Sequence, residues 1–477
     1  MTRLNCQKKK PVFLPIFLPS KFQIMRVHFI AVGGSAMHNL AIALHKKGYQ
    51  VTGSDDEIFE PSKTRLKNHG LLPEREGWFP ENITPELDAV ILGMHARQDN
   101  PELLRAQELG LKIFSYPEYL YEQTKNKTRV VIGGSHGKTT ITSMIMHVLR
   151  YTQIAFDYMV GAQLDGFDTM VSLTEDAKIA VFEGDEYLSS PIDRRPKFHL
   201  YFPNIALLSG IAWDHINVFP TFPFYVEQFQ IFADLIQPNG SLVYFGNDEN
   251  LKHVAAKTRA DVMKLPYNSH ESVIENGITY LVVGSEKIKL QIFGDHNLQN
   301  ISGAQLVCRQ LGLTAEQFYS AIAEFKGAAR RLEVLAETEN CVVFNDFAHS
   351  PSKLKATTEA VKRQFPERKL VACLELHTFS SLKKEFLPQY KKSMDAADLA
   401  VVYFNPHTIE HKKLEPITEQ QVAEAFDSPG LMVLTDSDEL FAFLKTQNWQ
   451  NTNLLLMTSG NFSGKNLKEL AGELVRN

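Results

Sequence analysis

From Arg26 to the C-terminus, short apolar runs rich in β-branched residues alternate with longer segments of helical hydrophobic spacing. This alternation is typical of strand–helix–strand units, in which parallel strands form a sheet that helices cover on both faces. The sequence therefore predicts an α/β fold. Its 477 residues exceed one ordinary core, and at roughly 100 to 200 residues per domain they predict about three domains.

Three blocks of this pattern can be separated, at residues 25–125, 126–327 and 328–477. The first contains the expected strands VHFIAVGG, QVTGSD and DAVILG and closes in the polar stretch EQTKNKT. The second contains RVVIGG, IAVFE and IALLSG, and ends in a helix expected around residues 299–325. The third follows GAARRLE and contains CVVFNDFAH, KLVACLEL, LAVVYF, LMVL and NLLLMTSG. We predict that each block is one domain built on a parallel or mixed sheet.

Residues 1–24 stand outside this pattern. Their KKK precedes PVFLPIFLP, an apolar run that prolines interrupt and that lacks a small-residue cleavage site, so a loose extension or a true start at Met25 is expected. No window reaches the roughly 18 to 20 apolar residues of a membrane-spanning helix. The net charge of −5 gives no basic field for nucleic acid, and the four widely spaced cysteines suit a reducing cytoplasm.

The strongest local motif is RVVIGGSHGKTTITSMIMHVL, in which a β run ends in a glycine loop and an amphipathic helix follows. In this context backbone N–H groups converge on phosphate oxygens and the helix N-terminus adds a positive dipole. Lys138 can neutralise the β- and γ-phosphates, and the Thr139 hydroxyl can bind Mg²⁺. An ordinary glycine turn followed by a surface lysine is the alternative. The expected nucleotide-binding residues are Gly134, Ser135, His136, Gly137, Lys138, Thr139 and Thr140.

Acidic residues follow two further apolar runs. Glu183, Asp185 and Glu186 come after IAVF, and Asp214 and His215 follow SGIAW. The carboxyl ends of parallel strands are where α/β sheets bind ligands, and carboxylate oxygens suit Mg²⁺. Taken alone, such a cluster is more often a solvated loop, and a lone histidine is more often structural. Beside a phosphate loop, they predict a metal site.

Together, in this order and spacing, the three segments resemble the Mur ligases, which activate a carboxylate as an acyl phosphate and couple it to an amine. The resemblance extends over about residues 25–477. It implies ATP and Mg²⁺ as cofactors, a Rossmann-like UDP-binding first domain, a central domain of the P-loop ATPase type and a Rossmann-like third domain. It also implies that Thr139, Glu183 and His215 bind metal.

Two further segments resemble nucleotide-binding parts of this family. GDHNLQNISGA matches the segment whose asparagine contacts adenine, which implies this role for Asn297, with His296 and Asn300 beside it. GAARRLE matches the linker before the third domain, from which Arg330 or Arg331 would reach the γ-phosphate.

NDFAHSP resembles the segment that opens the third domain, with Asp346 and His349 turned towards the nucleotide and the amine. The implied catalytic residues are Lys138, Arg330 and His349. The amine and its side groups would dock in the third domain, where LHTFSS and SGNFS are strand-end loops in suitable places.

The first block resembles the UDP-sugar domain of the branch that uses UDP-N-acetylmuramate. AVGGSAMHNLA supplies glycines for a diphosphate beside a helix, and Asp55, about twenty residues further on, is placed for a ribose or uracil contact. HARQDNPEL would lie near the sugar. Because the loop is not GxGxxG, it counts against NAD. The expected substrate-binding residues are Gly33, Gly34, Ser35, Met37, Asp55, His95 and Asn100.

Within that branch, the segment after Glu183 most resembles the murein peptide ligases, which join L-alanyl-γ-D-glutamyl-meso-diaminopimelate to UDP-N-acetylmuramate in peptidoglycan recycling. The resemblance rests on EY followed by Asp193, Arg195 and KF. The alternatives are the branch that adds L-alanine and, from another class, a non-catalytic sensor of UDP-sugar and ATP. The expected partners are UDP-N-acetylmuramate and a peptide or amino-acid amine, in a monomer or weak dimer, without nucleic acid or membrane insertion.

Overall fold

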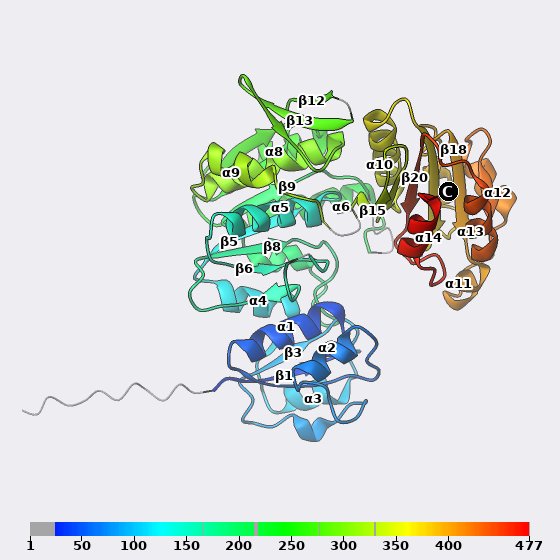
Figure 1. The fold of residues 1–477 in the computed structure, drawn as a ribbon. Coiled ribbons are helices and arrows are strands. Elements are labelled where there is room, and N and C mark those ends of the chain that lie inside the picture. Colours follow the sequence, from blue (N-terminus) through cyan, green and yellow to red (C-terminus); the bar gives the residue numbers. More distant parts are fainter. Residues whose placement is uncertain (1–23, 165, 214–217, 276, 329–330, 477) are drawn as a thin grey trace, which may run out of the picture.

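The computed structural model describes residues 24–164, 166–213, 218–275, 277–328 and 331–476. Three α/β bodies follow one another along the chain, with the third beside the central one (Figure 1). The predicted three-domain α/β fold is therefore confirmed. Within the described stretches, no helix has the length and apolar character needed to cross a bilayer.

The first body is a parallel four-stranded sheet in the order β2-β1-β3-β4. Because the strand order reverses between β1 and β3, their carboxyl ends open a crevice of the kind in which such sheets bind ligands. The loops after these two strands carry Gly33, Gly34 and His95. The elements are β1 (Arg26–Ile30), α1 (Ser35–Lys46), β2 (Gln50–Ser54), α2 (Ser62–Asn68), η1 (Pro80–Asn82), β3 (Ala89–Leu92), α3 (Pro101–Glu108), β4 (Ile113–Ser115) and α4 (Tyr116–Thr124).

The central body is a seven-stranded sheet in the order β11-β10-β9-β5-β8-β6-β7, parallel except for β7. Strand β5 lies between β8 and β9, so the loops after these three strands meet at one edge of the sheet. The strands are β5 (Thr128–Gly133), β6 (Phe156–Met159), β7 (Val171–Ser172), β8 (Ile179–Glu183), β9 (Ile205–Leu208), β10 (Ser241–Phe245) and β11 (Met263–Tyr267). The helices are α5 (Lys138–Tyr151), η2 (Lys197–Tyr201), α6 (Phe222–Asp234), α7 (Glu249–Lys257), α8 (Asp295–Gln310) and α9 (Ala315–Ile322).

The single helix expected around residues 299–325 is two helices, so this expectation was wrong. Helix α8 ends before Gly312, whose φ of +88° favours glycine. Thr314 then caps α9: its hydroxyl accepts the N–H of Gln317 at 3.2 Å, and the Gln317 side chain accepts the N–H of Thr314 at 2.9 Å. This reciprocal cap starts a new helix.

An antiparallel sheet projects from the central body towards the third (Figure 1). It consists of β12 (Ser272–Glu275), β13 (Ile278–Val283) and β14 (Glu286–Lys289). The buried side chain of Gln364 from the third body accepts the Thr279 hydroxyl at 2.9 Å and donates to the Gly277 carbonyl at 2.7 Å. The oxygen and the nitrogen of the Gln364 amide thus both bond to the central body.

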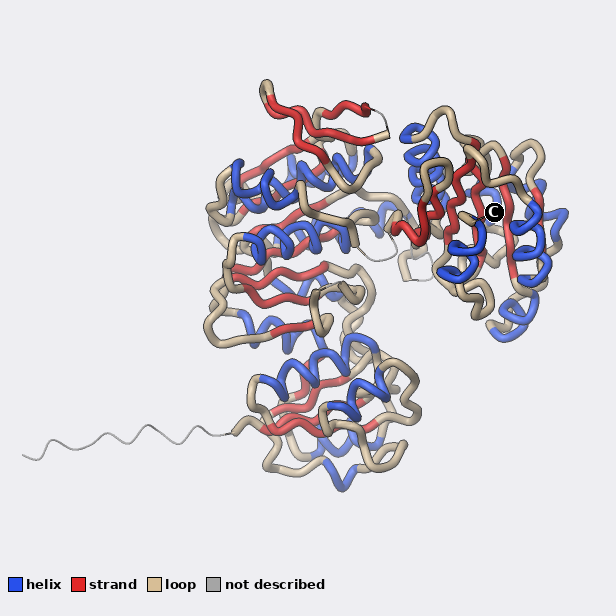
Figure 2. Tube along the Cα trace, viewed as in Figure 1, coloured by secondary structure: helices blue, strands red, loops and turns tan. Residues whose placement is uncertain are grey.

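The third body is a six-stranded sheet in the order β15-β16-β20-β17-β18-β19, with β15 antiparallel (Figure 2). Its strands are β15 (Glu333–Glu337), β16 (Val342–Asp346), β17 (Lys369–Leu376), β18 (Leu399–Phe404), β19 (Met432–Leu434) and β20 (Thr452–Met457). Its helices are α10 (Pro351–Gln364), η3 (Leu387–Tyr390), α11 (Pro406–His411), α12 (Glu419–Phe426), α13 (Ser437–Thr446) and α14 (Leu467–Leu474).

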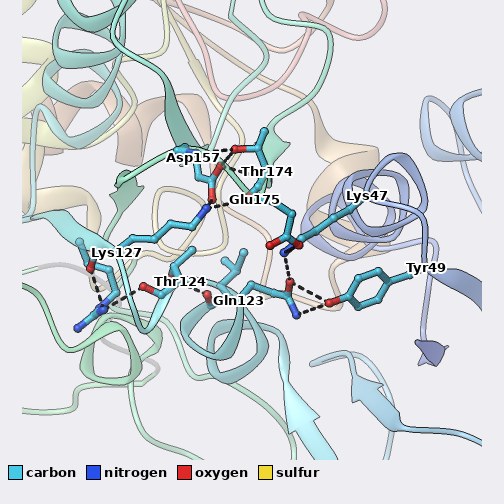
Figure 3. Close-up of polar contacts among 11 residues, drawn as sticks. Lys47, Tyr49, Gln123, Thr124, Lys127, Asp157, Thr174 and Glu175 are labelled. Carbon is cyan, nitrogen blue, oxygen red and sulfur yellow. Dashed lines mark hydrogen bonds and ion pairs between the residues drawn. The ribbon is translucent and has the colours of Figure 1, made fainter. Parts of the chain in front are cut away.

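Polar contacts join the first and central bodies (Figure 3). Lys127 donates to the fully buried carboxylate of Asp157 at 2.5 Å, and Asp157 also accepts the backbone N–H and the hydroxyl of Thr174, each at 2.8 Å. Nearby, Lys47 lies 3.0 Å from the exposed carboxylate of Glu175. The exposed Lys47–Glu175 pair thus joins the two bodies, whereas the buried Lys127–Asp157 pair lies beside it within the central body.

Candidate active site

The loop between β5 and α5 has the backbone that its glycines predict. Gly134 and Gly137 have φ values of +122° and +74°. A Cβ on Gly134 would lie 2.3 Å from the Ser209 hydroxyl oxygen, and one on Gly137 would lie 2.4 Å from Oδ1 of Asn300. Only glycine fits such space and such dihedral angles, so the loop is held tightly against β9 and α8.

Lys138, at the start of α5, forms an ion pair with Glu186, one of the three acidic residues at and after the end of β8. Its ammonium donates to Oε2 of Glu186 at 2.7 Å and to the Gly134 carbonyl at 2.7 Å. Burial alone would lower the pKa of Lys138, but the carboxylates, with Glu186 the strongest, raise it above its ordinary value. Lys138 is therefore a largely buried cation at the end of the loop.

Thr139 and Glu183 lie together beside this lysine. The Thr139 hydroxyl donates to Oε1 of Glu183 at 2.9 Å, and Oε2 accepts the Gly161 N–H at 2.8 Å. Among the described residues, no group of three His, Cys, Asp or Glu side chains is gathered for a metal ion. The expected ligand His215 lies outside the described residues.

A cleft of about 380 Å³ separates the central and third bodies. The phosphate loop from Ser135 to Thr140 lines one side, together with Glu183 and the start of α8. Asp346 and the beginning of α10 line the other. The His136 ring lies across the cleft mouth, where its Nε2 is 3.0 Å from the Ser352 hydroxyl. The volume falls in the range of small-molecule sites.

Charged groups from both sides face this cleft. Asp346 accepts the N–H groups of Leu332 and Ala348, each at 2.7 Å. Burial raises the pKa of Asp346, and Arg331 opposes this effect. Burial also lowers the pKa of His296, which Asp346 and Asp295 oppose. The described wall of the cleft thus contains cations near the loop and a buried acid opposite.

A second cavity of about 910 Å³, here called the third-domain cavity, lies beyond the cleft. His349 and Ser350 line it on the side of β16, and Tyr187, next to Glu186 in the chain, lines it from the central body. The loop after β17 and Lys412 form the remaining wall. The two cavities are therefore adjacent, with the Lys138–Glu186 pair near their junction.

In the first body, the side chain of Asp55 lies against the glycine loop that follows β1. The Gly33 N–H donates to Oδ2 of Asp55 at 2.6 Å, and Asp55 is 6% exposed. Burial raises the pKa of Asp55 to about 6, and the Gly33 N–H opposes this effect. Ser35 and His95 are exposed in the same region.

Two of the residues expected to bind substrate, Met37 and Asn100, are instead buried. Met37 is buried in the hydrophobic core under α1. Asn100 is buried and caps α3, where its side chain accepts the N–H groups of Glu102 and Leu103 at 3.0 and 3.1 Å.

Comparison with protein families identifies the whole architecture. The Mur ligase family catalytic domain matches residues 26–128, the Mur ligase middle domain matches 132–308, and the Mur ligase glutamate ligase domain matches 330–460. These three matches cover most of the chain. The chain belongs to the Mur ligase family. It is thus an ATP-dependent ligase that forms an amide bond in peptidoglycan synthesis.

Individual Mur ligases resemble this chain over most of its length. The UDP-N-acetylmuramate–L-alanine ligase of Carboxydothermus hydrogenoformans is 27% identical, over 92% of this chain and 95% of that one. A murein peptide ligase from Psychrobacter arcticus is 22% identical with a TM-score of 0.62, over 95% and 99%. The UDP-N-acetylmuramate–alanine ligase from Thermotoga maritima is 20% identical with a TM-score of 0.68, over 95% and 98%. At these identities, the structural likeness shows the fold.

In this Mur ligase the expected nucleotide residues largely come together. The cleft gathers Ser135, His136, Gly137, Lys138, Thr139, Thr140, Glu183, His296, Asn297, Asn300 and Asp346. Gly134 is part of the loop but packs closely against Ser209, His349 lines the third-domain cavity, and Arg330 lies outside the described residues.

Other residues of this site were not expected from the sequence. Ser209 follows β9 and donates to the His136 carbonyl. Tyr225 of α6 is 3.0 Å from the Ser135 hydroxyl and 3.3 Å from Oε1 of Glu186. The acidic segment pointed to Glu186 only as part of a cluster. Ser209 and Tyr225 have no local motif, because only the sheet order brings them to the loop.

Proposed function

We propose that this Mur ligase activates the lactyl carboxylate of UDP-N-acetylmuramate with ATP in the cytoplasm and couples it to an amine. The carboxylate attacks the γ-phosphorus to give an acyl phosphate and ADP, and the amine then displaces phosphate. One observation carries the proposal: Lys138 and Thr139 line the same cleft as Asp346 of the third body. The names of the curated relatives support the sugar substrate.

Magnesium would be held by the Thr139 hydroxyl and the Glu183 carboxylate, with His215 as a further ligand. Both described donors are oxygens, which Mg²⁺ prefers, and they lie 2.9 Å apart beside the loop. When bound, the ion offsets negative charge on the phosphates. Lys138 would turn from Glu186 to the γ-phosphate, and Arg330 would reach the same group.

The remaining nucleotide contacts come from both sides of the cleft. Asn297 would contact adenine, with His296 and Asn300 beside it, because all three lie at the start of α8. Asp346 and His349 would face the nucleotide and the amine from the third body. Taking 25–125, 126–327 and 328–477 as the three domains, every catalytic step then lies between the second and the third.

The UDP part would bind at the crevice of the first domain. Gly33, Gly34 and Ser35 precede or begin α1, whose N-terminus attracts the diphosphate. Asp55 accepts the Gly33 N–H in this structure, so the diphosphate would have to displace it. His95, exposed after β3, would lie near the sugar.

The first candidate for the amine is L-alanine. The curated relatives matched over most of this chain carry the name UDP-N-acetylmuramate–L-alanine ligase, at 27% and 28% identity for the first two. This support comes from sequence similarity over the whole chain.

The second candidate is the tripeptide L-alanyl-γ-D-glutamyl-meso-diaminopimelate, and the third-domain cavity favours it. A volume of about 910 Å³ suits a ligand much larger than one alanine. Lys383 and Lys412 line it, with Glu385 as an opposing charge. Because the tripeptide carries carboxylates on its glutamyl and diaminopimelyl residues, these lysines match its charge.

A substrate comparison tests both candidates. The purified enzyme receives ATP, Mg²⁺ and UDP-N-acetylmuramate with either L-alanine or the tripeptide, and the product mass identifies the amine that was joined. Phosphate release that requires both the sugar nucleotide and an amine is expected. Binding of ATP and UDP-sugar without turnover with either amine would instead support a sensor and refute the proposed ligase.

A further inference from the structure

A buried carboxylate lies at the end of β17, on the edge of the third-domain cavity. Glu375 has a side chain that is 3% exposed. Its Oε2 accepts the Phe462 N–H at 2.9 Å and the Thr458 hydroxyl. Two donors therefore fix this oxygen, and the nucleotide site described above makes no use of it.

His377 follows two residues later and connects this carboxylate to the cavity. Its Nδ1 lies 3.8 Å from Oε1 of Glu375, and its half-buried ring lines the cavity. The Gly460 backbone closes the other side, because a Cβ there would lie 2.7 Å from Oε2 of Glu375 and 2.8 Å from Cγ of His377. Across the described residues, Nε2 of His377 makes no hydrogen bond.

The coupling step requires such a base. An amino-acid or peptide amine enters as an ammonium ion at neutral pH, since the pKa of an α-amino group is about 8 in a peptide and higher in a free amino acid. An ammonium has no lone pair for the acyl carbon. A positioned base is the usual solution, and a histidine held by a carboxylate is a common form of it.

We propose that His377, which lies beside the buried carboxylate of Glu375, accepts a proton from the amine that attacks the acyl phosphate. This inference rests on the proposed function. One ammonium proton passes to Nε2 of His377, and the freed lone pair forms the C–N bond. The C–O bond to phosphate breaks, and phosphate leaves with that electron pair and takes the second proton. His377 then releases its proton to solvent.

The charges around His377 agree with this role. Burial lowers its pKa, Glu375 raises it and Lys412 lowers it, with a net decrease. Lys383, Glu385, His349 and Tyr390 are the other titratable groups that line this cavity within the described ranges, besides Tyr187. The lowered pKa favours the neutral ring when the amine arrives, and Glu375 stabilises the imidazolium that forms.

His349 shares the cavity but has a different partner. Its Nδ1 is 2.8 Å from the Phe347 carbonyl, which is a neutral group. A carbonyl orients a ring but stabilises its cationic form less than a carboxylate does. Because the buried carboxylate of Glu375 lies beside His377, we assign the proton to His377.

The test separates the two half-reactions in the full-length enzyme. Hydroxylamine is largely neutral at neutral pH and traps the acyl phosphate as a hydroxamate without needing a base. His377→Gln should form hydroxamate within about 3-fold of the unchanged enzyme and lose about 10²-fold or more in amide formation. That loss should shrink about tenfold per pH unit towards the amine pKa, as the free amine forms by itself.

Three comparisons decide the result. Glu375→Gln should lose amide formation in the same selective way, and His407→Gln, a substitution of an exposed side chain on α11, should change neither rate. Equal losses of both rates in His377→Gln, amide formation within about 3-fold, or a selective loss in His349→Gln alone would each overturn the inference. Absence of hydroxamate from the unchanged enzyme would instead refute the proposed ligase function.

Discussion

Lys138 and Glu186 form a buried ion pair, with 2.7 Å between Nζ and Oε2 and side-chain exposures of 15% and 1%. The pair joins the phosphate loop to the acidic segment after β8. Removing one member leaves the other charge buried without its oppositely charged partner, whereas removing both does not. Stability and catalysis can therefore be separated at this position.

Lys138→Ala is expected to lower the rate of amide formation by about 10²- to 10³-fold, because a charge contact to the transferring phosphoryl group is lost. It should also lower the free energy of unfolding by about 3 kcal/mol, since Glu186 remains buried. The double variant Lys138→Met with Glu186→Gln should regain most of that stability and stay inactive. Urea denaturation and product formation measure the two effects. Lys252→Ala, at an exposed position on α7, is the control, and Lys138→Ala with half the normal turnover would refute the role.

Glu183→Ala is expected to raise the Mg²⁺ concentration needed for half-maximal activity by about tenfold or more, because the oxygen proposed to bind the metal is lost. Activity is measured over a magnesium titration at saturating ATP. Glu175→Ala serves as the control, because its carboxylate is 79% exposed and lies in the seam between the first two domains. An unchanged magnesium dependence in Glu183→Ala would remove this residue from the metal site.

The ion pairs of Figure 3, one within the central domain and one between the first two domains, predict a contrast between two acidic residues. Asp157→Ala should lower the free energy of unfolding by about 3 kcal/mol, because Lys127 and Thr174 lose a fully buried partner. Glu175→Ala should change it by less than about 1 kcal/mol, because its ion pair is exposed. Thermal or urea unfolding of both variants tests the contrast. Similar effects would show that burial does not decide the strength of these pairs.

Buried His199 predicts a pH dependence of stability. Its Nε2 donates to the Gln228 carbonyl at 2.8 Å, and burial lowers its pKa to about 4. Above about pH 6.5 the ring is neutral in both states, and below it only the unfolded chain binds the proton. Its contribution is therefore fully present above about pH 6.5 and lost as the pH falls towards 4, by about 2 kcal/mol at about pH 5.

His199→Gln removes this titration. Urea unfolding of both proteins at about pH 7.5 and about pH 5 measures the difference. The variant is expected to be less stable at the higher pH, because it loses the stacking of the His199 ring on Phe198, whose ring centroids are 4.7 Å apart. On acidification it should lose less stability than the unchanged protein. Parallel losses in the two proteins would mean that another group accounts for the acid sensitivity.

The sequence predicts long buried strands well and short exposed ones poorly. Runs such as KLVACLEL are apolar on both faces, as central parallel strands require, and the structure contains them. The strands β12 and β14 are short and largely exposed, so no apolar pattern marks them. β15 has an equally weak pattern and pairs antiparallel at the sheet edge.

The site shows the same division between local and tertiary information. Gly134 to Thr140 are consecutive, so one loop motif predicts the phosphate cradle. Glu375 and His377 instead belong to a strand and the loop LHTFSS, which the sequence marks only as a suitable place. Their pairing depends on Gly460 and Phe462 of a distant segment, and no local motif encodes such a contact.

Most of the wall of the third-domain cavity comes from one stretch of the chain, residues 377–412, which contains none of the residues that line the nucleotide cleft. The phosphate loop lies more than two hundred positions earlier. Descendants of an ancestral ligase could therefore acquire a different acceptor by replacing this stretch alone, while inheriting the ATP-handling machinery unchanged. A chimaera that exchanges residues 377–412 with those of a relative would reproduce that divergence in the laboratory.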